Sequence, residues 1–317
     1  MKRKILIVGH GYFGGHLSKL LNQPAQSASE PPGKSLNGEN GLKIAFDVTV
    51  TTRRRAKLAQ YADAGMKAIL LDVTDPPNEP GSEIPQTFDS IVYCVGYDRT
   101  QDLSHREVYA EGLRKFLTRL KHPPGKFIYV SSTGVYGQQQ GEWTTEESTT
   151  DPMRESGQAC LEAENLLLHS DLPSQILITR FAGIYGPGRV PNLAKLTSDP
   201  LEIPADGFLN LIHVRDAAGW TRELLLDQQI RGNRIFNVSD GHPVQRRDFY
   251  REAARFAGLP CPRFTEPAGN SNFERSSANK RISNARIVNE TKYQLNYPDY
   301  QKGLEAIFAG ENSLEIN

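Results

Sequence analysis

The stretch that most constrains the fold is Lys4–Leu20, in which an apolar run leads into closely spaced glycines. Ile5–Val8 is continuously apolar, which is typical of a parallel strand buried on both faces. Gly9, Gly11 and Gly14 follow with the spacing G-x-G-x-x-G, and Leu17, Leu20 and Leu21 then recur at helical intervals. A strand, a glycine turn and a helix in this order predict dinucleotide binding, with the pyrophosphate at the helix N-terminus. The cofactor-binding residues predicted in this loop are Gly9, Gly11, Tyr12, Phe13 and Gly14; the alternative is a purely structural turn.

The bulk composition excludes several classes of protein. The chain has 317 residues, with 37 Lys+Arg and 37 Asp+Glu, so its zero net charge gives no support for a nucleic-acid or membrane partner. Its three cysteines lack metal-binding or disulfide spacing, so no metal site is expected. No apolar run reaches transmembrane length, and the first strand starts too early to follow a signal peptide. We expect a cytoplasmic protein that acts on a small molecule.

The end of the second expected strand, Ala45–Thr51, bears on cofactor choice. An acidic residue at this point binds the ribose hydroxyls of NAD, whereas an arginine accommodates the 2′-phosphate of NADP. Thr52, Arg53 and Arg54 stand there and Asp47 lies too early, so the sequence favours NADP, with NAD still possible. The alternative is that the arginines merely begin a solvated helix, 54–64.

Further strands and helices alternate along the chain. Strands are expected at 66–73, 88–97 and 126–132, and a helix at 104–120, which predicts an α/β fold with a doubly wound parallel sheet of Rossmann type. Residues 24–41 form an expected flexible insertion. Asp72 at a strand end fits an acceptor for the adenine amino group or a turn cap. The remaining predicted cofactor contacts are Val73, Val95, Gly96 and Ser131.

Four later segments carry a family resemblance. These are Ser131–Gly137 (SSTGVYG), Arg180–Gly188 (RFAGIYGPG), Asn210–Ala217 (NLIHVRDA) and Phe236–Pro243 (FNVSDGHP). Together they resemble the extended short-chain dehydrogenase/reductase superfamily, the NAD(P)-dependent epimerase/dehydratase group. The G-x-G-x-x-G form and the tail 293–309 resemble an atypical subgroup of that superfamily. The resemblance implies a cofactor domain over 1–185 to which 213–240 returns, a substrate lobe over 186–212 and 242–317, and a possible homodimer through helices 104–120 and 154–168.

The resemblance also shows where catalytic residues are missing. Members that transfer a hydride use a Ser or Thr after the fifth strand and a Tyr-x-x-x-Lys pair on the next helix. Ser132 matches the first, whereas Ser156 and Cys160 stand at the Tyr and Lys positions; neither provides the acid or the positive charge. Tyr136 is the predicted catalytic substitute, with Tyr185, Arg154 and Glu155 as alternatives. Thr133, Tyr185 and Arg189 are the predicted substrate contacts. The polar residues expected near a basic rim of the pocket are Arg189, Asn192, Arg215, Lys280 and Arg281, and ordinary solvated surface is the alternative for each.

Two functions remain open at this stage. The first is an NADP-dependent oxidoreductase or epimerase-like enzyme that acts on a small polar substrate, with a sugar-linked compound as one candidate. The second is an NAD(P)-binding sensor or partner-binding protein without redox chemistry, which would keep the glycine loop and dispense with the Tyr and Lys.

Overall fold

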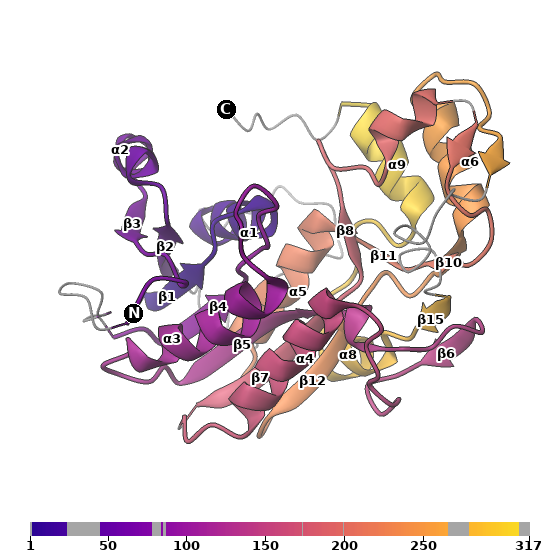
Figure 1. Cartoon of the computed structure of the whole chain (residues 1–317). Helices are drawn as coiled ribbons and strands as arrows, with labels where there is room; N and C mark the ends of the chain where they lie inside the picture. The colour runs from indigo at the N-terminus through magenta and orange to yellow at the C-terminus, as the bar shows by residue number, and fades with distance from the viewer. Residues whose placement is uncertain are drawn as a thin grey trace. The chain divides into compact units, whose positions relative to one another are not determined.

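A computed structural model describes residues 2–23, 45–77, 84, 87–172, 174–198, 200–265 and 279–310. The expected insertion 24–41 lies outside these residues. Within them, seven strands form one sheet in the order β12-β7-β5-β4-β1-β2-β3, which confirms the Rossmann-type α/β fold (Figure 1). The strands are β1 (Arg3–Val8), β2 (Phe46–Thr52), β3 (Lys67–Leu70), β4 (Ser90–Tyr93), β5 (Lys126–Ser132), β7 (Gln175–Phe181) and β12 (Arg234–Val238).

The N-terminal apolar run forms the centre of this sheet. Strand β1 pairs in parallel with β2 on one side and β4 on the other, with Ile5 opposite Val48 and Ser90. Ile5, Leu6, Ile7 and Val8 are completely buried, as expected for a strand covered on both faces. Strands β2–β3 and β4–β5 also pair in parallel. The carboxyl ends of these strands therefore lie along one edge, where α/β sheets of this type bind ligands.

The helices differ from the sequence expectations mainly at their ends. Helix α1 (Tyr12–Asn22) begins directly after Gly11 and contains Gly14, and α2 (Arg55–Asp63) begins one residue later than expected. The helix expected at 104–120 is a π-helical turn, Glu107–Glu111, followed by α3 (Gly112–Thr118). The remaining helices are α4 (Glu155–Leu168), α5 (Val214–Leu226), α6 (Arg246–Phe256), α8 (Ala285–Glu290) and α9 (Tyr300–Phe308). Among the described helices, none has the length and apolar character needed to cross a bilayer.

The chain divides into two compact units. Unit 1 comprises 1–131, 162–178 and 218–234, and unit 2 comprises 132–161, 179–217 and 235–317. Unit 1 contains β1–β4 with α1, α2 and α3. The sequence-based domain limits, 1–185 and 186–212 with 242–317, remain a prediction.

Unit 2 contains four described two-stranded pairings besides its parts of the large sheet: β8 with β11, β6 with β15, β10 with β13, and β9 with β14. Their bounds are β6 (Glu142–Thr144), β8 (Gly183–Tyr185), β9 (Leu201–Glu202), β10 (Phe208–Leu209), β11 (Leu211–His213), β13 (Val244–Gln245), β14 (Phe264–Thr265) and β15 (Lys280–Ile282). Helices α6 and α9 lie side by side in this unit (Figure 1). The rings of Phe256 and Phe308 stack between them.

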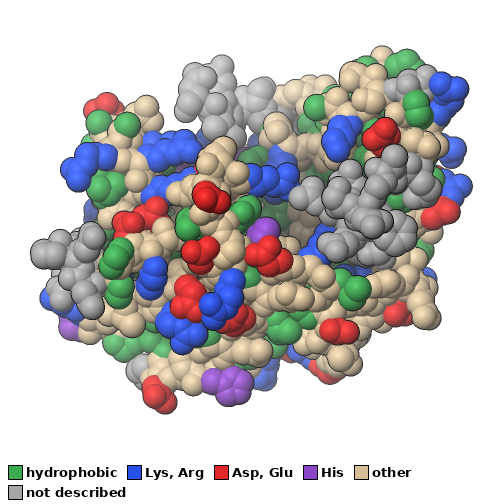
Figure 2. Space-filling view, in the orientation of Figure 1, with side chains coloured by type: hydrophobic (Ala, Val, Ile, Leu, Met, Phe, Trp, Pro, Cys, Tyr) green, Lys and Arg blue, Asp and Glu red, His purple; other side chains and the backbone are tan. Residues whose placement is uncertain are grey.

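The visible surface carries both signs of charge. In Figure 2, Lys and Arg side chains are interspersed with Asp and Glu side chains over the face shown. This pattern agrees with the equal numbers of basic and acidic residues in the chain.

Candidate cofactor and substrate residues

The three glycines of the loop after β1 differ in the space that surrounds each Cα. Gly9 has a φ of +99°, and a Cβ there would lie 2.7 Å from the carbonyl oxygen of Cys94. A Cβ on Gly14 would lie 2.3 Å from the carbonyl oxygen of Gly9, so α1 approaches the turn too closely for any side chain. A Cβ on Gly11 would meet no described atom within 4 Å. The loop is therefore tight at both ends and open at Gly11, which fits a pyrophosphate at the start of α1.

Side chains from neighbouring elements fix this loop. The amide of Gly9 donates to Oγ1 of Thr51 (3.1 Å). The two ring nitrogens of His10 lie 3.0 Å from Oη of Tyr61 in α2 and 2.8 Å from Oγ of Ser18 in α1. Burial, with Lys57 and Lys19 adding to it, lowers the pKa of His10 to about 4. His10 is therefore neutral and joins the loop to both helices, a role that its spacing alone did not predict.

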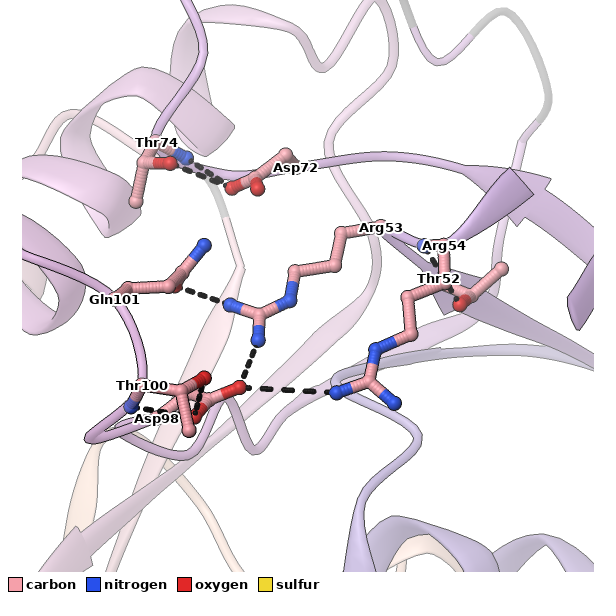
Figure 3. Close-up of polar contacts among 8 residues, drawn as sticks. All are labelled: Thr52, Arg53, Arg54, Asp72, Thr74, Asp98, Thr100 and Gln101. Carbon is pink, nitrogen blue, oxygen red and sulfur yellow. Dashed lines mark hydrogen bonds and ion pairs between the residues drawn. The ribbon is translucent and has the colours of Figure 1, made fainter. Parts of the chain in front are cut away.

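The arginines after β2 lie beside the loop that follows β4, as Figure 3 shows. Oγ1 of Thr52 accepts from the amide of Arg54 (3.2 Å), and α2 begins at Arg55. Arg53 donates to the carboxylate of Asp98 and to Oε1 of Gln101. Nη2 of Arg54 lies 3.8 Å from the same carboxylate oxygen of Asp98. Arg53 and Arg54 thus form a cationic pair at the end of β2, with an acidic neighbour that the sequence analysis missed.

The next two predicted cofactor segments follow β3 and β4. Oδ1 of Asp72 accepts from the amide (2.9 Å) and the hydroxyl (2.7 Å) of Thr74, so this carboxylate caps the turn (Figure 3). Val73 is buried. A Cβ on Gly9 would lie 2.9 Å from Cα of Val95, which places the backbone of Val95 directly against the glycine loop. Gly96 itself is exposed.

The side chain of Ser131 is engaged elsewhere than expected. Its hydroxyl donates to Oε1 of Glu164 in α4 (2.5 Å), and both residues are buried in unit 1. This hydrogen bond engages the hydroxyl of Ser131 with a buried carboxylate, and the cofactor contact of Ser131 stays a prediction.

Ser132 and Thr133 lie at a turn in unit 2 that the start of α4 touches. Oγ of Ser132 accepts from the amide of Gly134 (3.0 Å) and caps the 3-10 turn Thr133–Val135. A Cβ on Gly157 would lie 2.3 Å from the carbonyl oxygen of Gly134, so the first turn of α4 packs against this turn. Ser156 immediately precedes that contact and is partly exposed, whereas Cys160 is buried. The residue that the family resemblance matches to the catalytic tyrosine, Ser156, therefore lies next to the Ser132 turn.

The side chain of Tyr136, for which a catalytic role stays a prediction, lies in the interior of unit 2. Its ring is buried, and its hydroxyl accepts from Nη1 of Arg180 (2.8 Å) and donates to Oδ1 of Asn237 (2.8 Å). Burial raises the pKa of Tyr136 despite the nearby guanidinium. The hydroxyl of Tyr136 therefore links Arg180 and Asn237 through hydrogen bonds in the interior of unit 2.

Tyr185, a predicted substrate contact, lies in the same unit. This ring is fully buried in the core of unit 2, edge-on to His213 with the ring centres 5.3 Å apart. A Cβ on Gly303 would lie 1.9 Å from its hydroxyl oxygen, so α9 packs directly against it. Tyr185 therefore packs in the core of unit 2, and its substrate contact stays a prediction.

The expected basic rim divides into exposed and buried residues. Arg189 is exposed at a turn closed by its backbone pairing with Gly186, so its substrate contact remains a prediction. Lys280 is buried and donates to the backbone oxygen of Tyr136 (2.8 Å), which excludes it from a rim. Burial, and then Arg154, lower the pKa of Lys280 to about 8. Lys280 therefore holds the Tyr136 segment in place.

Two proteins that are 33% identical to this chain indicate its family. No family model matches the chain. Protein YeeZ of Escherichia coli K12 is 33% identical over 196 residues, which are 61% of this chain and 66% of YeeZ, slightly less than two thirds of that protein. The solved structure of a putative NAD-dependent epimerase/dehydratase from Methylobacillus flagellatus is 33% identical, covers 99% of this chain and 100% of its own, and superposes with a TM-score of 0.72.

More distant structures share the fold. Human epimerase family protein SDR39U1, solved with NADPH, is 17% identical with a TM-score of 0.71 over 98% of this chain and 99% of its own. UDP-glucuronic acid 4-epimerase from Bacillus cereus, solved with NAD and UDP-glucuronic acid, is 18% identical with a TM-score of 0.71 over 98% and 100%. With the close structural relative covered along its whole length, the chain belongs to the NAD-dependent epimerase/dehydratase family of extended short-chain dehydrogenases/reductases.

Proposed function

We propose that this chain is an NADP(H)-preferring oxidoreductase of the epimerase/dehydratase type that acts on a small polar substrate. One arrangement carries the proposal: a glycine loop open only at Gly11, with the guanidinium groups of Arg53 and Arg54 at the end of the next strand. The loop suits a pyrophosphate and the arginines suit a 2′-phosphate, and the two lie on adjacent parallel strands of unit 1.

The same residues define how the cofactor would be held. The start of α1 would receive the pyrophosphate, Arg53 and Arg54 the 2′-phosphate, and Asp72 the adenine amino group. When bound, the nicotinamide supplies a hydride acceptor or donor. Family members solved with NADPH and with NAD support both cofactors as candidates.

On the substrate side, Ser132 and Thr133 are the proposed contacts. Ser132 fixes the turn through its oxygen acceptor, and its hydroxyl proton can be donated to a substrate oxygen. Arg189, exposed near the Gly186 turn, suits a phosphate or carboxylate on the substrate. UDP-sugar epimerases among the more distant structures make a sugar-linked compound a reasonable first candidate, by analogy of fold alone.

A second candidate function is an NAD(P)-binding sensor. The specific observation in its favour is that Ser156 and Cys160 occupy the positions of the acid and of the lysine that activates it, while Tyr136 and Tyr185 are enclosed. These four side chains therefore supply no accessible acidic proton at the position that hydride chemistry requires. A protein that only binds the cofactor has no need of one.

Two experiments separate these functions. Thermal-shift titrations with NADPH, NADP, NADH and NAD test cofactor binding, because a ligand that binds only the native state raises apparent stability. The protein loaded with NADP(H) is then mixed with a panel of UDP-sugars and small carbonyl compounds, and nicotinamide oxidation state is followed by absorbance. Turnover by the parent supports the enzyme. Turnover only after the double substitution Ser156→Tyr with Cys160→Lys favours the sensor, and absence of binding for all four cofactors rejects both.

A further inference from the structure

The proposed 2′-phosphate site of unit 1 already contains an internal anion. Arg53 directs one terminal nitrogen to the carboxylate of Asp98 and the other to Oε1 of Gln101, so both ends of its fork are occupied by the 98–101 segment (Figure 3). Arg54 approaches the same oxygen of Asp98 at 3.8 Å. A phosphate uses this fork in the same bidentate way as a carboxylate does.

Asp98 is fixed in this position from its own side. Oδ1 accepts from the amide (3.0 Å) and from the hydroxyl (2.7 Å) of Thr100, which leaves Oδ2 for the two arginines. The hydrogen bonds from Thr100, and then the charge of Arg53, lower the pKa of Asp98. The carboxylate is therefore ionised at neutral pH and is oriented before any cofactor arrives.

We propose that Asp98 is a specificity-determining residue that competes with the 2′-phosphate of NADP(H) for Arg53 and so limits the preference of this site for NADP(H) over NAD(H). The inference rests on the proposed function, since it deepens the cofactor choice at the same site. A bound 2′-phosphate must displace the Asp98 carboxylate from Arg53, and the two anions repel each other at short range. NAD(H) has a hydroxyl at this position, which needs no arginine and can itself donate to a carboxylate.

The test compares NADPH and NADH binding to the full-length chain by quenching of protein fluorescence. Asp98→Asn removes the charge but keeps an oxygen for the Thr100 turn, and we expect it to tighten NADPH by about tenfold while NADH binds equally or less well. Asp102→Asn is the matched control, because it removes a carboxylate from an exposed position of the same loop. Arg53→Gln is expected to weaken NADPH, and Asp98→Asn in that background is expected to give no gain.

Each outcome bears on a different statement. If Arg53→Gln weakens NADPH but Asp98→Asn and Asp102→Asn have equal effects, the competition is refuted and the proposed cofactor site stands. If Arg53→Gln leaves NADPH binding unchanged, the competition is refuted together with the role of Arg53. If the parent binds neither NADPH nor NADH, the proposed function fails and the inference with it. Adenosine 2′,5′-bisphosphate as a competitor confirms that any gain depends on the 2′-phosphate.

Discussion

Replacement of Asp240 by asparagine should change how the stability of the protein depends on pH. Asp240 ends the Phe236–Asp240 segment and is buried in unit 2. Its Oδ1 accepts from the amide of His242 (2.9 Å), and among the described residues Oδ2 has no hydrogen-bond partner. Burial, then Asp299 and Asp216, raise the pKa of Asp240 from 3.8 to about 8. The folded protein therefore keeps a proton on this carboxyl up to about pH 8, whereas the unfolded chain loses it near pH 3.8.

The sign and size of the effect follow from linkage. Between pH 3.8 and pH 8 the unfolded chain binds fewer protons at this site than the folded one, so the free energy of unfolding falls as the pH rises. The contribution is fully present below pH 3.8 and is lost as the pH rises through about 8. At about 1.4 kcal/mol for each tenfold change in the dissociation constant, the loss amounts to about 6 kcal/mol at most. The Asp240→Asn substitution removes this loss.

The substitution also lowers the free energy of unfolding, so the stability difference between variant and parent changes sign with pH. The amide nitrogen that it introduces is buried without an acceptor, which costs about 1–3 kcal/mol at every pH. Above pH 8 we expect the free energy of unfolding of the variant to exceed that of the parent by about 3 kcal/mol. Below pH 4 we expect the variant to be the less stable of the two. Urea unfolding followed by circular dichroism across this pH range measures the difference. Asp171→Asn, at an exposed position, is the control, and parallel pH profiles for parent and Asp240→Asn would refute the reasoning.

Three further outcomes follow from the site. Gly14→Ala should destabilise the protein by about 1–3 kcal/mol in urea unfolding and weaken NADPH in fluorescence titration, because the new Cβ would meet the Gly9 carbonyl at 2.3 Å. Tyr136→Phe should cost about 1–3 kcal/mol of stability, because it leaves a buried Arg180 N–H without its acceptor, while cofactor affinity is kept; an unchanged stability with lost turnover would support the catalytic prediction. For His10, whose pKa is lowered to about 4, the stability that the neutral ring provides is present above pH 6.5 and lost as the pH falls through 4; His10→Gln should reduce that acid dependence in thermal melts.

What the sequence could predict is what local geometry dictates. The glycine spacing predicted the strand, turn and helix correctly, because the positive φ of Gly9 and the contact of Gly14 with Gly9 involve residues only five apart. The alternation of apolar runs likewise predicted the parallel sheet. The partners of Tyr136 lie 44 and 101 residues away in the chain, and nothing in the spacing of Arg180 and Asn237 indicates that they would enclose its hydroxyl. The neighbour of Arg53 was missed for the same reason, since Asp98 is 45 residues away.

The geometry around Gly157 bears most directly on whether the chain is an enzyme. Because a Cβ at this position would lie 2.3 Å from the Gly134 carbonyl, the first turn of α4 can approach the Ser132 turn only through a glycine. Ser156, which the family resemblance matches to the catalytic tyrosine, precedes Gly157 at this contact with the Ser132 turn. A tyrosine introduced at 156 together with a lysine at 160 would therefore enter a backbone already arranged for them, apart from the space that the buried Cys160 must yield. If the resemblance places the family's acid at Ser156, turnover by the parent protein requires another proton donor, and a parent that binds the cofactor without turnover would identify the site as one for binding.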